Sequence, residues 1–440
     1  MVNRVTTRSM AKETVMSKFS QLFKKNSYLY GSATIMLFFM SWGIWWSFFQ
    51  IWLTSPTGGI QLNGSQVGTV YAINGAGTLI LMFVYGAVQD KLYLKRTLVI
   101  IVSAIMALIG PFAQFIYQPL LKNNFTLGAI LGGIILATGF VGAVSLFEAY
   151  VERISRVHGF EFGQARMWGS VGYAIVALIA GFMFTVNPFI NFWVGSALGL
   201  VLLLIQIFWK TESDETHAAI TPDTPSVSEM FALLKDPKVW AVIGFVFLSW
   251  TFYTVFDQQM FPDFYTTLFV DQATGQQMYG VLNSIQVFLE AAMMALVPIL
   301  LNKVGARNSL LLGVTVMFLR IGMCAVFDSA ILISVAKLLH AIEVPLFVLG
   351  IFKYFSIHFN PALSATLYLV AWNLASQLGN VILSNPLGRV RDSIGYQPTF
   401  MIISGVALVA AVYLFLFLKK DDQAVYKPAE PQVISPEPTK

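Results

Sequence analysis

Eight ionisable side chains lie inside long apolar segments of this 440-residue chain. Three of them, Lys337, His340 and Glu343, follow one another at intervals of three residues, so a helix would place them on one face within an arc of about 120°. A buried histidine beside a carboxylate titrates near neutral pH and can pass a proton. The spacing predicts a polar helix face that handles protons, with a hydrogen-bonded structural triad as the alternative.

With the other ionisable residues of the apolar segments included, the acids outnumber the cations. These other residues are Glu148, Arg166, Asp257, Glu290 and Arg320. With the histidine neutral, four carboxylates accompany three cations, and an unpaired carboxylate in an apolar medium is costly, so one acid should prefer to be protonated. This surplus acid is a natural proton carrier. The count leaves open which acid it is, and Glu343 is favoured because it shares a face with the histidine.

Glu148 and Arg166 fall on consecutive predicted helices and could meet across a cavity. Such a pair is charge-assisted, and it can bind neighbouring hydroxyls of a sugar. Tyr173 follows Arg166 by two helical turns and could lie against the apolar face of a pyranose, with plain core packing as the alternative. A cluster of this composition suits a neutral polyol better than an ion or a hydrophobic drug.

The composition requires a membrane around these residues. Hydrophobic residues make up 57% of the chain and charged residues 11%, against about 25% charged residues in typical soluble domains. Mean hydropathy is +0.70, so a soluble globule could not bury its apolar surface, and a disordered chain is excluded. The net charge of +5 fits positive charge retained on the cytoplasmic side better than nucleic-acid binding.

Apolar stretches long enough for membrane helices recur along the chain. A spanning helix needs about 20 mostly apolar residues, and the segments that qualify are 28–53, 66–88, 97–119, 127–150, 164–186, 189–209, 239–262, 278–301, 308–327, 329–352, 362–385 and 397–418. The runs are continuous and do not alternate, which excludes a transmembrane β-barrel. The predicted fold class is an all-α membrane protein with twelve transmembrane helices.

The twelve helices divide into two halves of six. A basic loop follows the second helix of each half, at 86–96 and 302–308, which suggests internal duplication. Two six-helix halves around a midplane site describe the major facilitator fold. The expected organisation is an N-terminal tail, a six-helix bundle, a linker, a second six-helix bundle and a C-terminal tail, at 1–27, 28–210, 211–237, 238–418 and 419–440.

Lysine and arginine are distributed unevenly between the predicted loops. With both termini inside, 21 of the 27 Lys and Arg residues fall on the cytoplasmic side and three on the opposite side. By the positive-inside rule, this predicts a multi-pass protein of the cell inner (cytoplasmic) membrane with both termini, and the linker, cytoplasmic.

Four segments carry a resemblance to a known family. They are Glu148–Arg153 (EAYVER), Phe160–Arg166 (FEFGQAR), Phe256–Gln259 (FDQQ) and Lys337–Pro345 (KLLHAIEVP). With them the chain resembles the lactose permease family of oligosaccharide–proton symporters, in the major facilitator superfamily, and most closely its sucrose permease branch. The resemblance extends over nearly all of 28–418.

The resemblance implies a role for each matching position. The implied sugar-binding residues are Glu148, Arg166, Tyr173, Tyr253, Glu290 and His340. The implied proton-coupling residues are Glu343, Arg320, His340, Asp257 and Lys337. Among these, Glu343 would carry the coupled proton, and Tyr173 stands where lactose permease has a Trp stacked on the sugar.

Other positions depart from the lactose permease pattern. Val287 stands where that protein has a sugar-binding Glu, and Glu290 occupies the place of an Asn one turn along. Thr254 and Ser376 replace a charged Asp–Lys pair. These departures follow the sucrose permease pattern and count against a galactoside, whereas Glu148 matches the lactose permease Glu where sucrose permease has Asp.

These features together predict a proton-coupled symporter that imports a disaccharide, sucrose first, by alternating access. Maltose, lactose, melibiose or raffinose stay open as substrates, and a proton-coupled drug antiporter is a less favoured alternative. The sequence holds no nucleophile triad, metal-ligand spacing or phosphate-binding loop, so we expect no enzyme, no metal or other cofactor and no nucleic-acid partner. The expected partners are the disaccharide, the proton and the lipid bilayer, and the expected functional unit is a monomer.

Overall fold

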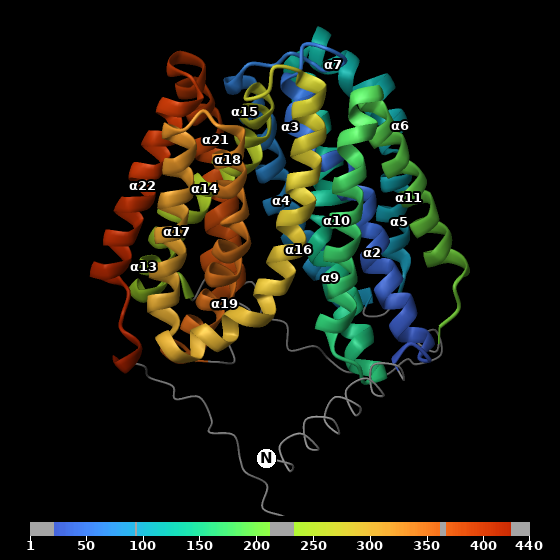
Figure 1. Ribbon diagram of the computed structural model, residues 1–440. Helices are drawn as coiled ribbons and strands as arrows, with labels where there is room; N and C mark the ends of the chain where they lie inside the picture. The colour runs from blue at the N-terminus through green and yellow to red at the C-terminus, as the bar shows by residue number, and fades with distance from the viewer. Residues whose placement is uncertain (1–21, 93–94, 212–232, 361–366, 424–440) are drawn as a thin grey trace, which may run out of the picture.

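The computed structural model describes residues 22–92, 95–211, 233–360 and 367–423. Within these ranges the chain is built from helices, with no strand (Figure 1). The predicted linker and both predicted tails lie largely outside the described residues. The all-α membrane fold class is confirmed.

The helices of the first half run from α2 to α11. Their bounds are α2 (Asn26–Trp46), α3 (Phe49–Thr54), α4 (Gly64–Leu92), α5 (Thr97–Ala107), α6 (Ile109–Pro111), η1 (Phe112–Tyr117), α7 (Gln118–Asn123), α8 (Phe125–Leu136), η2 (Ala137–Val141), α9 (Ala143–His158), α10 (Phe162–Val186) and α11 (Pro188–Phe208). In Figure 1 most of these elements, blue to green, lie on the right, with α3 and α4 near the middle of the molecule.

The helices of the second half run from α13 to the short η7. Their bounds are α13 (Pro237–Val246), η4 (Phe247–Thr251), α14 (Phe252–Gln259), α15 (Phe261–Thr267), α16 (Gln272–Val304), α17 (Ala306–Val326), α18 (Ala330–Leu338), α19 (His340–His358), η6 (Tyr368–Leu374), α21 (Ala375–Ile394), α22 (Tyr396–Phe417) and η7 (Asp421–Gln423). In Figure 1 they occupy the other side, with α16 lying against α10.

Ten helical runs in the described residues are long and apolar enough to cross a membrane. An eleventh is formed if Thr97–Ala107 and Ile109–Asn123, which meet at a 44° bend, count as one span. The remaining predicted segment, 362–385, lies partly outside the described residues, and its described part consists of η6 and the start of α21. The predicted spans therefore coincide with helical runs wherever the chain is described.

Several helices change their winding beside the charged residues. The π-helical turn η2 precedes α9, which carries Glu148, and η4 precedes α14, which carries Asp257. Between α18 and α19 the helix is interrupted at Leu339, which separates Lys337 from His340. Such local rewinding re-aims side chains and is frequent at functional sites.

The two sides of the molecule pack closely at one end through small residues. On α4, a Cβ added at Gly68 would overlap the Ser384 carbonyl of α21, and a Cβ at Gly280 of α16 would lie 3.0 Å from the Ala177 carbonyl of α10. Small residues allow membrane helices to approach this closely. Asp392 reinforces the contact, because its carboxylate accepts hydrogen bonds from the first backbone amides of α4, at 2.7 and 2.8 Å.

Candidate functional site

Glu148 of α9 and Arg166 of α10 form an ion pair. Arg166 Nε lies 2.5 Å from Glu148 Oε1, and both side chains stay about one-third exposed, at 31% and 32%. The guanidinium also lies 4.2 Å from the centre of the Phe39 ring. Arg166 Nη1 also donates to the Ser170 hydroxyl, at 3.4 Å. The ion pair that the sequence predicts between consecutive helices is therefore formed and partly exposed.

A second set of charges is buried in the other half. Arg320 and Glu343 are fully buried, with Arg320 Nε 2.7 Å from Glu343 Oε2. Arg320 Nη1 lies 3.1 Å from Asp257 Oδ1, which also accepts a hydrogen bond from Lys337 Nζ at 2.9 Å. Two cations and two carboxylates therefore form one compact network, and Arg320 joins its two acids.

His340 connects this network to a cavity between the helices. Its Nε2 is hydrogen-bonded to the Tyr253 hydroxyl and lies 3.7 Å from Asp257 Oδ2, while its Nδ1 lies 3.6 Å from Glu290 Oε2. Glu290 also accepts a hydrogen bond from Gln286, at 2.9 Å. Among the described side chains no Arg or Lys pairs with Glu290, so in this arrangement it is the acid left without a cation.

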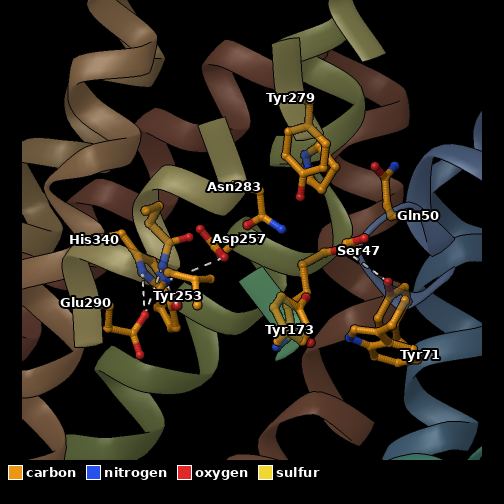
Figure 2. Close-up of a pocket in the computed structure, with 15 residues that line it drawn as sticks. Ser47, Gln50, Tyr71, Tyr173, Tyr253, Asp257, Tyr279, Asn283, Glu290 and His340 are labelled. Atoms are coloured by element: carbon orange, nitrogen blue, oxygen red, sulfur yellow. Dashed lines mark hydrogen bonds and ion pairs between the residues drawn. The ribbon is translucent and has the colours of Figure 1, made fainter. Parts of the chain in front are cut away.

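These groups surround two adjoining cavities. The first, here called the histidine cavity, has a volume of about 190 Å³ and is lined by Tyr173, Tyr253, Asp257, Glu290 and His340 among others. Figure 2 shows Glu290, His340 and Tyr253 along one side of it and Gln50 and Tyr71 along the other, with Tyr173 and Asn283 between.

The second cavity, here called the amide cavity, has a volume of about 430 Å³ and contains Glu148. The two cavities share Trp46, Tyr71, Tyr253 and Gln258 as wall residues. The predicted sugar-binding residues are thus divided: Glu148 faces the amide cavity, and Tyr173 and Glu290 face the histidine cavity. All ten predicted site residues lie in or beside this pair of cavities, or in the buried network next to them.

The positions that depart from lactose permease also lie at the cavity walls. Val287 lines the histidine cavity, next to Glu290. Thr254 and Ser376 line the amide cavity, and the Thr254 hydroxyl donates to the Trp250 carbonyl, at 2.8 Å. Both positions therefore place small polar side chains at the wall of the amide cavity.

Several lining residues are neutral amides, which a count of ionisable groups in the sequence does not include. Asn74 and Asn380 line the amide cavity, and Asn283 and Gln286 line the histidine cavity. A search for neutral amides within apolar segments would have found them, because such side chains need a partner or a cavity in a membrane helix. Within the described residues no cluster of His, Cys, Asp and Glu could hold a metal ion.

Residues 20–430 match the family described as LacY proton/sugar symporter. The chain is 42% identical over 415 residues to the sucrose permease of Escherichia coli, a match that covers 94% of this chain and 99% of that protein. It is 33% identical over 379 residues to the lactose permease of Klebsiella oxytoca, covering 84% and 90%.

Among solved structures, the nucleoside transporter NupG superposes with a TM-score of 0.75 at 17% identity, covering 90% of this chain and all of that one, and this likeness supports the fold. The family match extends over nearly the whole chain, and its boundaries enclose every described helix and both cavities. The chain is a multi-pass membrane protein with the major facilitator fold, and it belongs to the LacY proton/sugar symporter family.

Proposed function

We propose that the protein imports a disaccharide together with a proton, with sucrose as the first candidate. The observation that carries this proposal is the separation of two charge systems. The Glu148–Arg166 pair is open to a cavity, whereas the Arg320–Glu343 pair is fully buried. The first suits a hydroxyl-rich ligand, and the second suits a proton that must stay out of contact with water.

In this proposal Glu148 and Arg166 hold one sugar unit by its hydroxyls. Tyr173 lies against the ring of that sugar unit, and Glu290, with His340 and Tyr253, binds further hydroxyls of the same unit from the histidine cavity. An arginine is suited to this task because its planar fork can donate two parallel hydrogen bonds.

Glu343 is proposed to carry the coupled proton. In the arrangement described here, Arg320 donates to Glu343, which stabilises an ionised carboxylate. In the sugar-binding state Glu343 would be protonated and separated from Arg320. Its return to Arg320 would release the proton. The Asp257–Lys337 ion pair would keep the other charges of the network paired.

The proposed organisation follows from the closely packed end of the molecule. We assign 28–210 and 238–418 to two six-helix bundles joined by a cytoplasmic linker, with both termini cytoplasmic in a bacterial inner membrane. The end closed by Gly68 and Asp392 is then periplasmic, and the cavities face the cytoplasm. Rocking of the bundles about the cavities would provide alternating access, and a monomer suffices because both bundles belong to one chain.

Sucrose is favoured over other disaccharides for two reasons. The relative with 42% identity over nearly the whole chain is named a sucrose permease. Val287 cannot form a hydrogen bond, and Glu290 supplies a carboxylate one turn away, so the wall is arranged differently from that of a lactose carrier. Lactose, maltose, melibiose and raffinose are the alternative substrates.

The test is sucrose-induced alkalinisation of a lightly buffered suspension of cells that express the protein. A symporter removes protons from the medium when sucrose is added, and Arg166→Lys should remove this signal. Acidification by an added drug, with no response to any disaccharide, would indicate the antiporter instead. A normal rate of sucrose entry without proton movement would refute coupling while keeping the sugar site.

A further inference from the structure

Three buried polar side chains of the amide cavity have unsatisfied hydrogen-bonding groups. Asn74, Thr78 and Asn380 are 3%, 2% and 8% exposed. Asn74 Oδ1 and Nδ2, Thr78 Oγ1 and Asn380 Oδ1 have no hydrogen-bond partner within the protein. Because buried polar groups are nearly always paired in folded proteins, such a cluster marks a place where another molecule supplies the partners.

The three side chains converge from two helices. Asn74 and Thr78 are four residues apart on α4 and share a face, and Asn380 comes from α21, which packs along α4. All three line the amide cavity. The helices belong to opposite bundles, so the cluster is assembled only while the bundles are packed as they are here.

The wall of the same cavity also contains aromatic rings, which together with polar groups form a surface suited to carbohydrates. Trp250 and Trp372 lie with their ring centres 4.6 Å apart, and the Tyr368 ring stacks on Trp372 at 5.8 Å. All three line the same cavity. Amides and a hydroxyl donate to and accept from sugar hydroxyls, and aromatic rings offer apolar surface to the C–H groups of the sugar ring.

We propose that Asn74, Thr78 and Asn380 form a second glycosyl subsite, which binds the sugar unit that does not occupy the Glu148–Arg166 pair. This inference rests on the proposed function. Glu148 lines the same cavity, so a disaccharide held there by one unit can extend its other unit toward the amides. The subsite therefore selects for ligands with two sugar units over those with one.

The subsite has a direct test in the binding of sucrose and of its two halves. Sucrose, methyl α-glucopyranoside and methyl β-fructofuranoside are titrated against the purified full-length protein and against Asn74→Leu and Asn380→Leu. Each variant replaces an amide by an apolar group of similar size. We expect the sucrose Kd to rise about tenfold, with the Kd of one half unchanged and that of the other half raised.

Two further variants keep the test decisive. Thr78→Val removes only a hydroxyl that has no partner in the protein, so it should fold and still weaken sucrose binding several-fold. Asn308→Leu also exchanges an amide for an apolar group, at an exposed position of α17 outside both cavities where the amide donates to the Val304 carbonyl at 2.9 Å. It should leave all three Kd values unchanged.

The subsite is refuted if the variants bind sucrose as tightly as the wild type does, or if both methyl glycosides weaken equally, which would indicate a general change in the cavity. Failure of the wild type to bind any disaccharide would overturn the proposed function, and the subsite with it. The two failures are therefore distinguishable by the wild-type titration.

Discussion

Glu343→Gln should separate sugar movement from proton coupling if Glu343 carries the proton as we propose. The substitution keeps the shape of the side chain and mimics a permanently protonated carboxyl group. Exchange of sugar across the membrane needs only the protonated, sugar-loaded carrier, whereas net accumulation requires the empty carrier to return without its proton. We therefore expect sucrose–sucrose exchange to persist and accumulation to disappear.

The structure indicates that this variant will still fold. Removing one partner of a buried ion pair typically costs about 3–5 kcal/mol. Here Arg320 keeps Asp257 at 3.1 Å, and the Gln amide oxygen can still accept from Arg320 Nε. The loss is then closer to that of a hydrogen bond to a charged group, about 1.5–3 kcal/mol, which lies below the usual stability of about 5–15 kcal/mol.

The size of the transport effect follows from the membrane potential. One charge moved through 100 mV is worth about 2.3 kcal/mol, and about 1.4 kcal/mol corresponds to a tenfold concentration ratio. If a single proton on Glu343 accompanies each sugar, a potential of that size should support about 50-fold accumulation in the wild type. In Glu343→Gln the ratio should stay near one.

Proteoliposomes with an imposed potassium diffusion potential allow both quantities to be measured with labelled sucrose. Glu290→Gln is the matched control, since it neutralises a second carboxylate of the cavities that has no Arg or Lys partner among the described residues. It should weaken sucrose binding and retain accumulation. Retained accumulation in Glu343→Gln, with loss in Glu290→Gln, would place the coupled proton on Glu290 and refute our assignment.

Three further predictions concern the sugar pair, the substrate and the closed end. Arg166→Lys should weaken sucrose binding by at least about tenfold without lowering the unfolding temperature, because the lysine ammonium is a point charge and lacks the planar fork of donors of the arginine guanidinium. Near wild-type binding would exclude the proposed role. Unlabelled sucrose should inhibit sucrose uptake at concentrations more than about tenfold lower than lactose does, and the reverse order would overturn the substrate assignment. Asp392→Asn should open the end capped at α4 and speed maleimide labelling of a Ser384→Cys background, because Ser384 is fully buried against Gly68 at this end, while Asp392→Glu should not. Burial would raise the pKa of Asp392, but hydrogen bonds from Arg391 and from the first amides of α4 lower it overall below its ordinary 3.8. The cap is therefore intact at neutral pH and is lost only as the pH falls through that lowered value.

The helices and the charged residues could be predicted from the sequence because both signals are local. An apolar run of sufficient length must span the membrane. An ionisable residue within it is costly and therefore marks a paired or functional position. The interval of three residues from Lys337 to Glu343 likewise predicted one polar face. The structure adds an interruption at Leu339 within that face, which periodicity alone does not reveal.

The distribution of partners could not be predicted, because it depends on how distant helices pack. The sequence predicts four acids and three cations within the apolar segments, yet the count does not say which acid lacks a cation. In the structure Arg320 contacts both Asp257 and Glu343, which leaves Glu290 beside His340. The amides of α4 and α21 can be found in the sequence as neutral polar residues within apolar segments, but their lack of hydrogen-bond partners is visible only in the packed structure.

His340 lies between the cavity that contains Glu290 and the buried charge network. Its two ring nitrogens face different systems, Nδ1 toward Glu290 and the cavity, and Nε2 toward Tyr253 and Asp257 of the buried network. Nδ1 has no hydrogen-bond partner among the described residues, so a sugar hydroxyl that bonds to Glu290 would give it one and, through the ring, change the hydrogen bond at Nε2. Because Asp257 and Glu343 share Arg320, a change at Asp257 alters how strongly Arg320 holds Glu343. In our proposal the coupling between sugar and proton therefore runs from Glu290 through His340 and Asp257 to Arg320, which holds or releases Glu343.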